Sequence, residues 1–147
     1  MNYVGRWKFH SIGTLNDENE LVYLNAEEYL NSPMTYVDES DEEAVADERR
    51  ERRQMVGMQI EVCADGALYM LMPLPDGVTQ AEIDEAVSAG EIKLCDGMII
   101  DDPKTWEERN GELWIEVGTD MSDDGWAKVA DDDSFINFIT VRYVKAE

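Results

Sequence analysis

The chain has 147 residues, 44% of them hydrophobic, which is enough for one domain built around one core. Acidic residues outnumber basic residues by 34 to 12, so the formal net charge is −22. This charge argues against nucleic acid and anionic membrane surfaces as partners, because it repels them, and it favours cations or basic partners.

No targeting or membrane segment stands out in the chain. Its first residues lack the basic and apolar regions of a signal peptide, and no apolar run approaches the roughly 20 residues that span a bilayer. We therefore expect a cytoplasmic protein with no membrane insertion. The two cysteines, Cys63 and Cys95, lie far apart in the sequence, and we expect free, half-buried thiols rather than a disulfide.

Short strands separated by turns dominate the pattern. The first strand spans residues 4–12, where alternation places Trp7 and His10 on opposite faces. Asp-Gly at residues 65–66 and Asn-Gly at residues 110–111 are turn signals that each join two strands into a hairpin. Further strands are expected at residues 20–24, 55–63, 67–72, 91–94, 98–100, 106–109, 112–117, 126–130 and 135–144.

Two short helical segments carry N-terminal capping signals. A Thr-x-x-Glu capping box that begins at residue 79 predicts a helix up to residue 89. Asn25, with Glu28 three residues later, predicts a single helical turn that ends at residue 30. With about eight to ten strands around them, these segments predict a mainly all-β antiparallel barrel or sandwich with one or two short helices.

The segment 38–54 has the strongest bias in composition. Ser40 and Glu43 form a further capping box, acidic residues fill the first turns, and four arginines fill the last turns. The apolar face of this segment is thin, so we expect a solvated helical insertion or lid rather than a core element. The neighbouring acids neutralise the arginines, which favours a solvated surface over an anion or partner site.

The first strand carries a family resemblance. The run Val4-Gly5-Arg6-Trp7-Lys8 resembles the opening of cytosolic fatty-acid-binding proteins, and its Gly-x-Trp is similar to the first signature of lipocalins. The resemblance implies a calycin-like up-and-down barrel over residues 1–147, with 38–54 as an insertion. It also implies that Trp7 plugs the closed end of the barrel and that a basic residue of the last strand, here Arg142, packs across it. Gly5, Trp7 and Arg142 are thus the expected closure residues.

One departure from the family concerns the carboxylate clamp. Fatty-acid-binding proteins often hold the ligand carboxylate with an Arg-x-Tyr pair on the last strand, whereas Arg142 and Tyr143 are adjacent here. Because side chains alternate along a strand, the two residues point to opposite faces. The clamp is therefore not expected even if the barrel is present.

A loop near the C-terminus matches a calcium-binding pattern. Asp120, Ser122 and Asp124 stand at positions one, three and five of an EF-hand loop, with Asp131 at position twelve. Both flanks read as strands rather than helices, and Lys128 at position nine opposes a cation. An acidic hairpin loop is therefore favoured, and no metal or other cofactor is expected.

The catalytic motifs that we sought are missing or weak. His10 is the only histidine, so a multi-histidine zinc site is excluded and any Ser-His-Asp or Cys-His catalyst depends on this one residue. Alternation places His10 outside the barrel, and the 34 acids make chance carboxylate pairs certain. We therefore expect a protein that is not an enzyme.

The leading hypothesis is non-covalent binding of a small hydrophobic or amphipathic molecule, such as a lipid, inside the barrel. A first alternative is a filled barrel that contacts an unknown protein partner through its acidic surface and the helix with Arg49–Arg53, since small barrels can be filled by side chains. A second alternative is an enzyme on a lipocalin-like scaffold. The expected ligand-binding residues are Phe9, Tyr69, Leu71, Leu113, Ile115, Phe138, Thr140 and Arg142.

Overall fold

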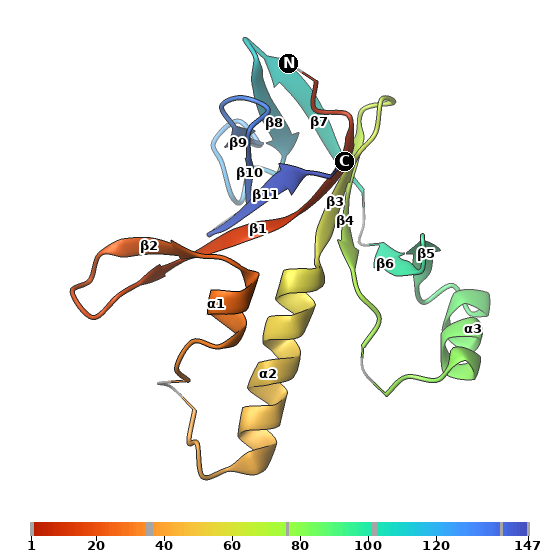
Figure 1. Cartoon of the computed structure of the whole chain (residues 1–147). Coiled ribbons are helices and arrows are strands. Elements are labelled where there is room, and N and C mark those ends of the chain that lie inside the picture. Colours follow the sequence, from red (N-terminus) through yellow and green to blue (C-terminus); the bar gives the residue numbers. More distant parts are fainter. Residues whose placement is uncertain (1, 35–36, 76, 101–102, 139, 147) are drawn as a thin grey trace.

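The computed structural model describes residues 2–34, 37–75, 77–100, 103–138 and 140–146. These residues form one antiparallel sheet that curls almost into a barrel, with three helices around it (Figure 1). The strands are β1 Gly5–Leu15, β2 Leu21–Leu24, β3 Gln59–Val62, β4 Ala67–Met72, β5 Lys93–Cys95, β6 Met98–Ile100, β7 Lys104–Arg109, β8 Glu112–Glu116, β9 Trp126–Ala130, β10 Ile136–Phe138 and β11 Val141–Lys145. The helices are α1 Ala26–Leu30, α2 Glu42–Gly57 and α3 Gln80–Ser88.

The strand order confirms the mainly β, antiparallel fold that the turn signals predicted, and it shows a nearly closed barrel rather than a sandwich. Neighbouring strands follow the order β10-β11-β1-β3-β4-β7-β8-β9, and β9 contacts β10 at the seam. Read as a ring that starts at β1, the barrel visits its strands in chain order, which is the up-and-down arrangement. This architecture is compatible with a calycin-like fold. The strands β2, β5 and β6 lie off the ring.

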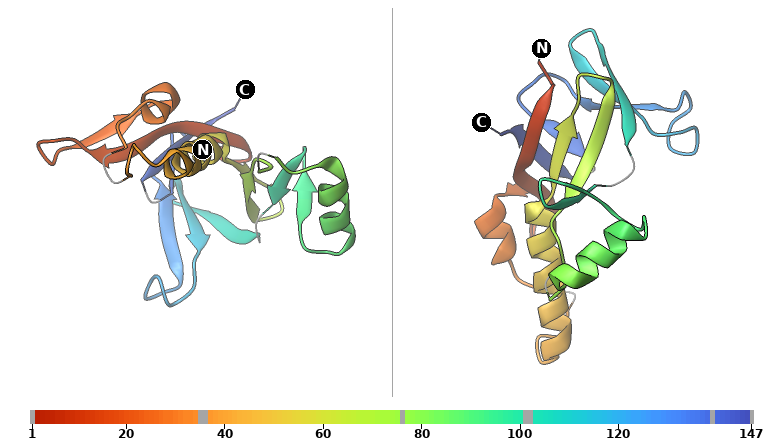
Figure 2. Two further views of the ribbon diagram at one scale, coloured as in Figure 1. Left: turned by 90° about the horizontal axis from the view of Figure 1, so that it is seen from below. Right: turned by 90° about the vertical axis from the view of Figure 1, so that its right-hand side faces the viewer.

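The first and last strands meet, as the Gly-x-Trp resemblance implied. β1 pairs with β11 between Trp7 and Ile12, and Trp7 lies opposite Lys145 in the register. The amide of Ala146 also donates a hydrogen bond of 2.8 Å to the carbonyl of Arg6. On its other edge β1 pairs first with β3 and then with β2, so it connects the barrel to a hairpin that projects away from it (Figures 1 and 2).

The core lies on the concave side of this sheet. It is built from aromatic and branched side chains that alternate with exposed positions along each strand, as expected for a sheet with one face in water. Burying them supplies the main driving force for folding. The buried cluster consists of Tyr3, Trp7, Ile60, Val62, Leu68, Leu113, Ile115, Val129, Ala130, Ile136, Val141 and Tyr143.

Local signals set the helix starts. The side chain of Asn25 accepts from the Glu28 amide while the Glu28 side chain accepts from the Asn25 amide, so the predicted capping box of α1 is present. Thr79 caps α3 as expected. The cap of α2 is Asp41 rather than Ser40, because the Ser40 hydroxyl bonds to the carboxylate of Asp38 instead.

Two predicted strands are corrected by the structure. Residues 55–57 were expected in a strand but continue α2, which ends at Gly57, so β3 begins only at Gln59. The expected strand 135–144 is two strands, β10 and β11, that pair with each other across a turn. The prediction failed there because the segment is apolar on both sides of the turn, so its alternation alone does not mark the break.

Beyond the barrel, the segment with α3, β5 and β6 forms an excursion on the opposite side from the β1–β2 hairpin (Figure 2). α2 extends from one end of the barrel and packs beside α1 (Figure 1). Among the described helices, none is both long enough and apolar enough to cross a membrane.

Candidate functional site

The barrel interior contains several of the predicted ligand-binding residues. Leu113 and Ile115 are almost completely buried and belong to the core cluster. Phe9 and Phe138 pack against the same cluster, and the Phe138 ring meets Tyr143 edge-on at 6.5 Å. These side chains contact each other and the core where a ligand was expected. Burial also raises the pKa of the Tyr143 phenol to about 12.

The other four predicted ligand-binding residues lie elsewhere. Leu71 is fully buried, but alternation along β4 puts it on the face opposite the core residue Leu68. Tyr69 lines a hollow of about 280 Å³ that it shares with Gly90–Lys93 on the excursion. Thr140 is exposed in the turn between β10 and β11, and its carbonyl accepts from the Gly13 amide at 2.7 Å. Arg142 stacks on the ring of Tyr23, 3.6 Å from its centroid. The structure therefore does not bring the eight predicted residues into one site.

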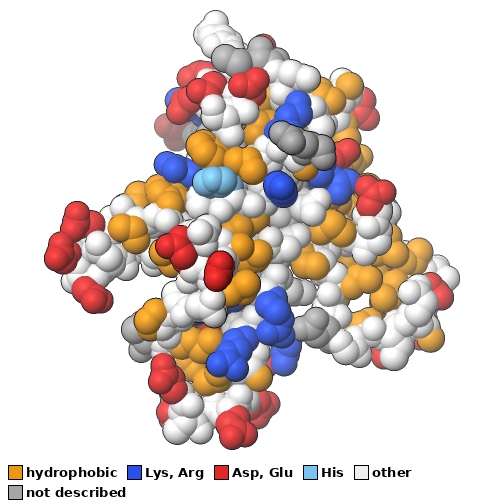
Figure 3. All heavy atoms as spheres, viewed as in Figure 1, with side chains coloured by type: hydrophobic (Ala, Val, Ile, Leu, Met, Phe, Trp, Pro, Cys, Tyr) orange, Lys and Arg blue, Asp and Glu red, His pale blue; other side chains and the backbone are white. Residues whose placement is uncertain are grey.

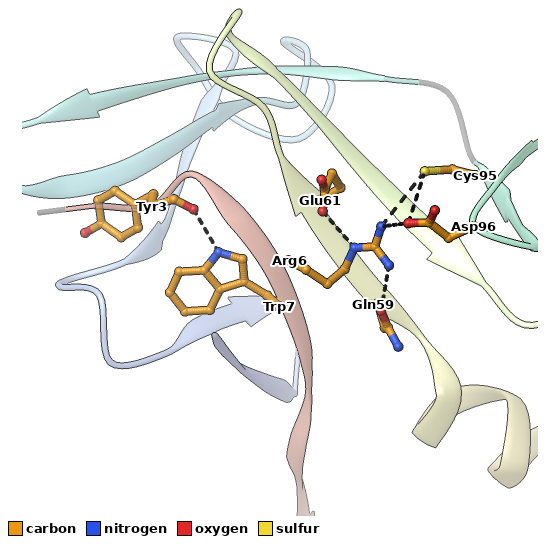
Figure 4. Close-up of polar contacts among 7 residues, drawn as sticks. All are labelled: Tyr3, Arg6, Trp7, Gln59, Glu61, Cys95 and Asp96. Atoms are coloured by element: carbon orange, nitrogen blue, oxygen red, sulfur yellow. Dashed lines mark hydrogen bonds and ion pairs between the residues drawn. The ribbon is translucent and has the colours of Figure 1, made fainter. Parts of the chain in front are cut away.

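The closure pair at the barrel end differs from the expected one. Trp7 is fully buried and its indole N–H donates to the Tyr3 carbonyl at 2.8 Å (Figure 4). The cation near its ring is Lys145, whose Nζ lies 6.0 Å from the centroid. Arg142 instead lies opposite Ser11 in the register, and since Tyr143 faces the core, the adjacent Arg142 faces outward. The expected pairing of Arg142 with Trp7 is thus corrected to Lys145.

The residue between Gly5 and Trp7 organises a polar network on the outer face. The guanidinium of Arg6 bonds to Glu61 at 2.7 Å, to Asp96 at 2.8 Å and to the Gln59 side-chain oxygen at 3.0 Å (Figure 4). It ties the β5–β6 turn to β3. Sequence reasoning missed this role, because Asp96 lies 90 residues away in the chain. The carboxylates of Glu61 and Asp96 neutralise the Arg6 cation, so we interpret this network as one that stabilises the fold.

The two cysteines and the histidine are the side chains that could most readily act as a nucleophile or a base. Cys63 and Cys95 are both free, as expected, and burial is the main cause that raises the pKa of the Cys63 thiol. His10 is exposed on the outer face, also as expected. Its Nδ1 lies 2.9 Å from the Ser11 hydroxyl and its ring lies 4.9 Å from that of Phe135. Within the described ranges, no carboxylate forms an ion pair or hydrogen bond with the imidazole, which is how a catalytic triad orients its histidine.

The acidic loop between β8 and β9 has strands on both sides, as predicted, rather than the helices of an EF-hand. The Asp124 carboxylate accepts from the Trp126 amide and from the Ser122 hydroxyl, and these bonds lower its pKa. Asp131 forms an ion pair of 2.7 Å with Lys128. In the described residues, Asp120 and the other acids form no group of three or more carboxylates, thiols or imidazoles that could hold a metal ion.

A groove between α1 and α2 is the best candidate for a binding site. It encloses about 660 Å³ between one face of α2 and the chain that leaves α1. Lys and Arg side chains gather beside apolar ones over this part of the molecule (Figure 3). Its lining combines the two kinds of side chain: Leu30, Asn31, Ser32, Pro33, Met34, Glu39, Val45, Arg49 and Arg53.

The helical period explains which arginines reach the groove. Val45, Arg49 and Arg53 are spaced four residues apart, so they lie on one face of α2. Arg50 lies off this face and forms an exposed ion pair of 2.9 Å with Asp47. Arg49 is exposed and forms no ion pair within the described part of the chain.

One buried arginine fixes the walls of the groove. Arg52 forms an ion pair of 2.9 Å with Glu48, and their side chains are only 3% and 9% exposed. Its remaining N–H groups donate to the carbonyls of Tyr29, Ser32 and Pro33. The segment after α1 is therefore held against α2 by hydrogen bonds from a single side chain. The sequence offered the i,i+4 spacing of Glu48 and Arg52 but nothing about these long-range carbonyls.

Comparison of the chain with protein-family models, curated proteins and solved structures found no match.

Proposed function

We propose that this protein is a non-enzymatic interaction module, in which a filled barrel carries a groove for a protein partner. Support comes first from the interior. Trp7, Leu113 and Tyr143 are nearly inaccessible and pack in one cluster, so the barrel resembles those that side chains fill. The interior ligand site stays a prediction with weaker support, because the residues expected to line it contact each other.

We also place the barrel among the calycins. The support is the Gly5-x-Trp7 opening of β1, the burial of Trp7, and a cation from the last strand beside its ring, a position that Lys145 fills. On this proposal the chain keeps the end closure of that superfamily. It uses the outside of the barrel, rather than the inside, for recognition.

The observation that carries the proposal is the groove between α1 and α2. Its apolar side chains suit aliphatic groups of a partner, and the exposed guanidinium of Arg49 suits a carboxylate, which arginine binds through paired hydrogen bonds. Glu39 at the lining opposes a fully acidic ligand. The partner segment is therefore one that alternates carboxylates with aliphatic side chains.

The structure of the groove lowers the cost of binding. The hydrogen bonds of the buried Arg52 hold residues 29–33 in place before a partner binds, so little backbone has to be ordered on association. The net charge of −22 repels an acidic segment at long range. At physiological ionic strength this repulsion is screened beyond about 8 Å, and the contacts within the groove decide the affinity.

The test uses a fluorescein-labelled peptide of alternating leucine and glutamate and a fluorescence anisotropy titration in about 150 mM NaCl. We expect saturable binding by the natural chain, weakened about tenfold or more by Arg49→Glu, which reverses a groove charge. Arg50→Glu is the matched control, because it makes the same charge change outside the groove and should alter the affinity less than about twofold.

Two outcomes would contradict the proposal. Equal weakening by both substitutions would mean that the peptide senses only the net charge. Absence of peptide binding, together with native mass spectrometry that releases a small molecule on organic extraction, would place the function in the barrel interior instead. A mass equal to that of the chain alone, before and after extraction, is the result expected for a filled barrel.

A further inference from the structure

The hairpin of β1 and β2 projects from the barrel and has an open edge (Figure 1). β2, Leu21–Leu24, pairs with β1 on one side and with no other strand among the described residues. Such an edge offers backbone N–H and C=O groups to any chain that can pair with it.

The hydrogen-bond pattern identifies which groups of β2 face outward. In an antiparallel pair, residues that exchange hydrogen bonds alternate with residues that do not. The Asn16 amide donates to the Glu20 carbonyl at 3.0 Å, so the next bonded positions along β2 are Val22 and Leu24. It follows that Leu21 and Tyr23 point their N–H and C=O groups away from β1.

The opposite strand supports the same assignment. Gly13 is the partner of Tyr23 in the register, and its amide donates to Thr140 at 2.7 Å, on the side away from β2. If Gly13 turns away from β2, alternation requires that its partner Tyr23 turns away from β1. The outward N–H and C=O groups of Leu21 and Tyr23 have no partner in the described chain.

The side chains on one face of the hairpin are also unusually exposed. Leu15 is 62% exposed, Leu21 is 59% exposed and Tyr23 is 38% exposed. A Cβ at Gly13 would lie 3.2 Å from both Leu21 and Tyr23, so the glycine lets these two side chains lie across it. The guanidinium of Arg142 stacks on the Tyr23 ring and restricts its movement.

We propose that an extended, basic segment of a partner protein adds a strand to this edge of β2. The backbone groups of Leu21 and Tyr23 supply the hydrogen bonds, and the exposed face of the hairpin supplies apolar contact. Asp17, Glu18 and Glu20 are exposed at the hairpin tip and attract lysine or arginine side chains that flank such a strand.

Electrostatic repulsion also disfavours a second copy of this chain as the partner that pairs with the β2 edge. Pairing two β2 edges would bring together two acidic tips from molecules that each carry a net charge of −22. A basic segment gains from the same charges. This edge is separate from the groove between α1 and α2, so the two proposals succeed or fail independently.

The probe is a fluorescein-labelled peptide of alternating lysine and valine, titrated by anisotropy. Leu21→Pro removes an outward N–H while leaving the bonds between β1 and β2 intact, since proline is tolerated at the first residue of a strand. Leu21→Ala is the matched control, which removes the side chain but keeps the N–H. We expect Leu21→Pro to weaken binding about tenfold or more and Leu21→Ala to weaken it about threefold or less.

Amide hydrogen exchange on the natural chain gives a second readout that needs no substitution. Addition of the peptide should slow exchange at Tyr23 and leave Val22 and Leu24 unchanged, because those two are already bonded to β1. Equal weakening by the two Leu21 substitutions, or unchanged exchange at Tyr23, would overturn strand addition. A dimer of the natural chain that is lost in Leu21→Pro would overturn the choice of partner.

The peptide with glutamate in place of lysine tests the charge argument. Measured on Arg49→Glu, in which the groove for carboxylates is weakened, it should bind about tenfold more weakly than the lysine peptide, and equal binding would overturn the basic character of the partner. Arg49→Glu, which alters the groove, should leave the affinity for the lysine peptide unchanged. A clear gain of that affinity in Arg49→Glu would mean that the peptide occupies the groove rather than the edge, because the new glutamate attracts lysine.

Discussion

The side chain of Arg52 lies buried between α1 and α2, where oxygen atoms from both elements surround its guanidinium. It donates to the Glu48 carboxylate and to the backbone carbonyls of Tyr29, Ser32 and Pro33. A buried charge is tolerated only when it is paired and its donors are satisfied, and both conditions hold here. This one side chain therefore supports both the helix packing and the shape of the groove.

Replacement of Arg52 by alanine should be strongly destabilising. It leaves Glu48 buried without its cation, and breaking a buried ion pair from one side costs about 3 kcal/mol or more. Urea unfolding followed by tryptophan fluorescence gives the free energy of unfolding. Arg50→Ala is the control, since its ion pair with Asp47 is exposed and should contribute less than about 1 kcal/mol. Equal losses in the free energy of unfolding for Arg52→Ala and Arg50→Ala would contradict this stabilising role of Arg52.

At the same scale, the sequence predicted single residues well where the signal was local. Trp7 was expected to be an inward-facing residue of the first strand, and it is fully buried in the core. Its cationic neighbour was assigned to Arg142 but is Lys145, because the choice between them depends on the register between β1 and β11. A register is set by pairing across the whole chain, and a shift of one residue exchanges the two faces of a strand.

The elements were predicted reliably where capping residues mark a start. The Asn25 box and the Thr79 cap both stand where expected. The end of α2 was predicted wrongly: the helical segment was expected to end at residue 54, but α2 continues to Gly57. No glycine or proline before Gly57 marks the end of the helix, so the sequence gives no local signal for this boundary. Contact with the end of β4 fixes this boundary instead: a Cβ at Gly57 would lie only 2.8 Å from the Pro73 ring.

Gly57→Ala should therefore destabilise the protein even though alanine favours helices. The added methyl group meets a rigid ring, and overpacking of this kind costs about 1–3 kcal/mol. Pro73→Ala removes the obstructing ring atoms, so the double substitution should recover most of the loss caused by Gly57→Ala. The free energies of unfolding of the four proteins give the coupling directly. Additive effects would show that the two residues do not clash.

For the whole molecule, the turn signals predicted an antiparallel barrel or sandwich, the resemblance of the first strand favoured the up-and-down barrel, and neither predicted the groove. The barrel follows from strands joined by short turns, and each turn is encoded within a few residues. The groove depends on residues 30–34 meeting α2 around Arg52, a contact that no local pattern encodes. The filling of the interior has the same origin, since it depends on side-chain volumes from all strands together.

The net charge of −22 acts on the folded molecule as a whole. Carboxylates spread over the surface repel one another, and the compact state suffers more from this repulsion than the expanded unfolded chain. Added salt screens the repulsion, since the Debye length falls from about 30 Å at 0.01 M to about 3 Å at 1 M. The melting temperature should thus rise with ionic strength.

We expect the melting temperature, followed by circular dichroism at neutral pH, to rise by several degrees between about 0.01 M and about 1 M NaCl. The control is the same series near pH 4, close to the isoelectric point of 4.1, where the net charge is small and the salt dependence should nearly vanish. A melting temperature that falls with salt at neutral pH would mean that ion pairs such as Arg6–Glu61 outweigh the general repulsion. An equal rise at both pH values would point to salt acting on apolar burial rather than on charge.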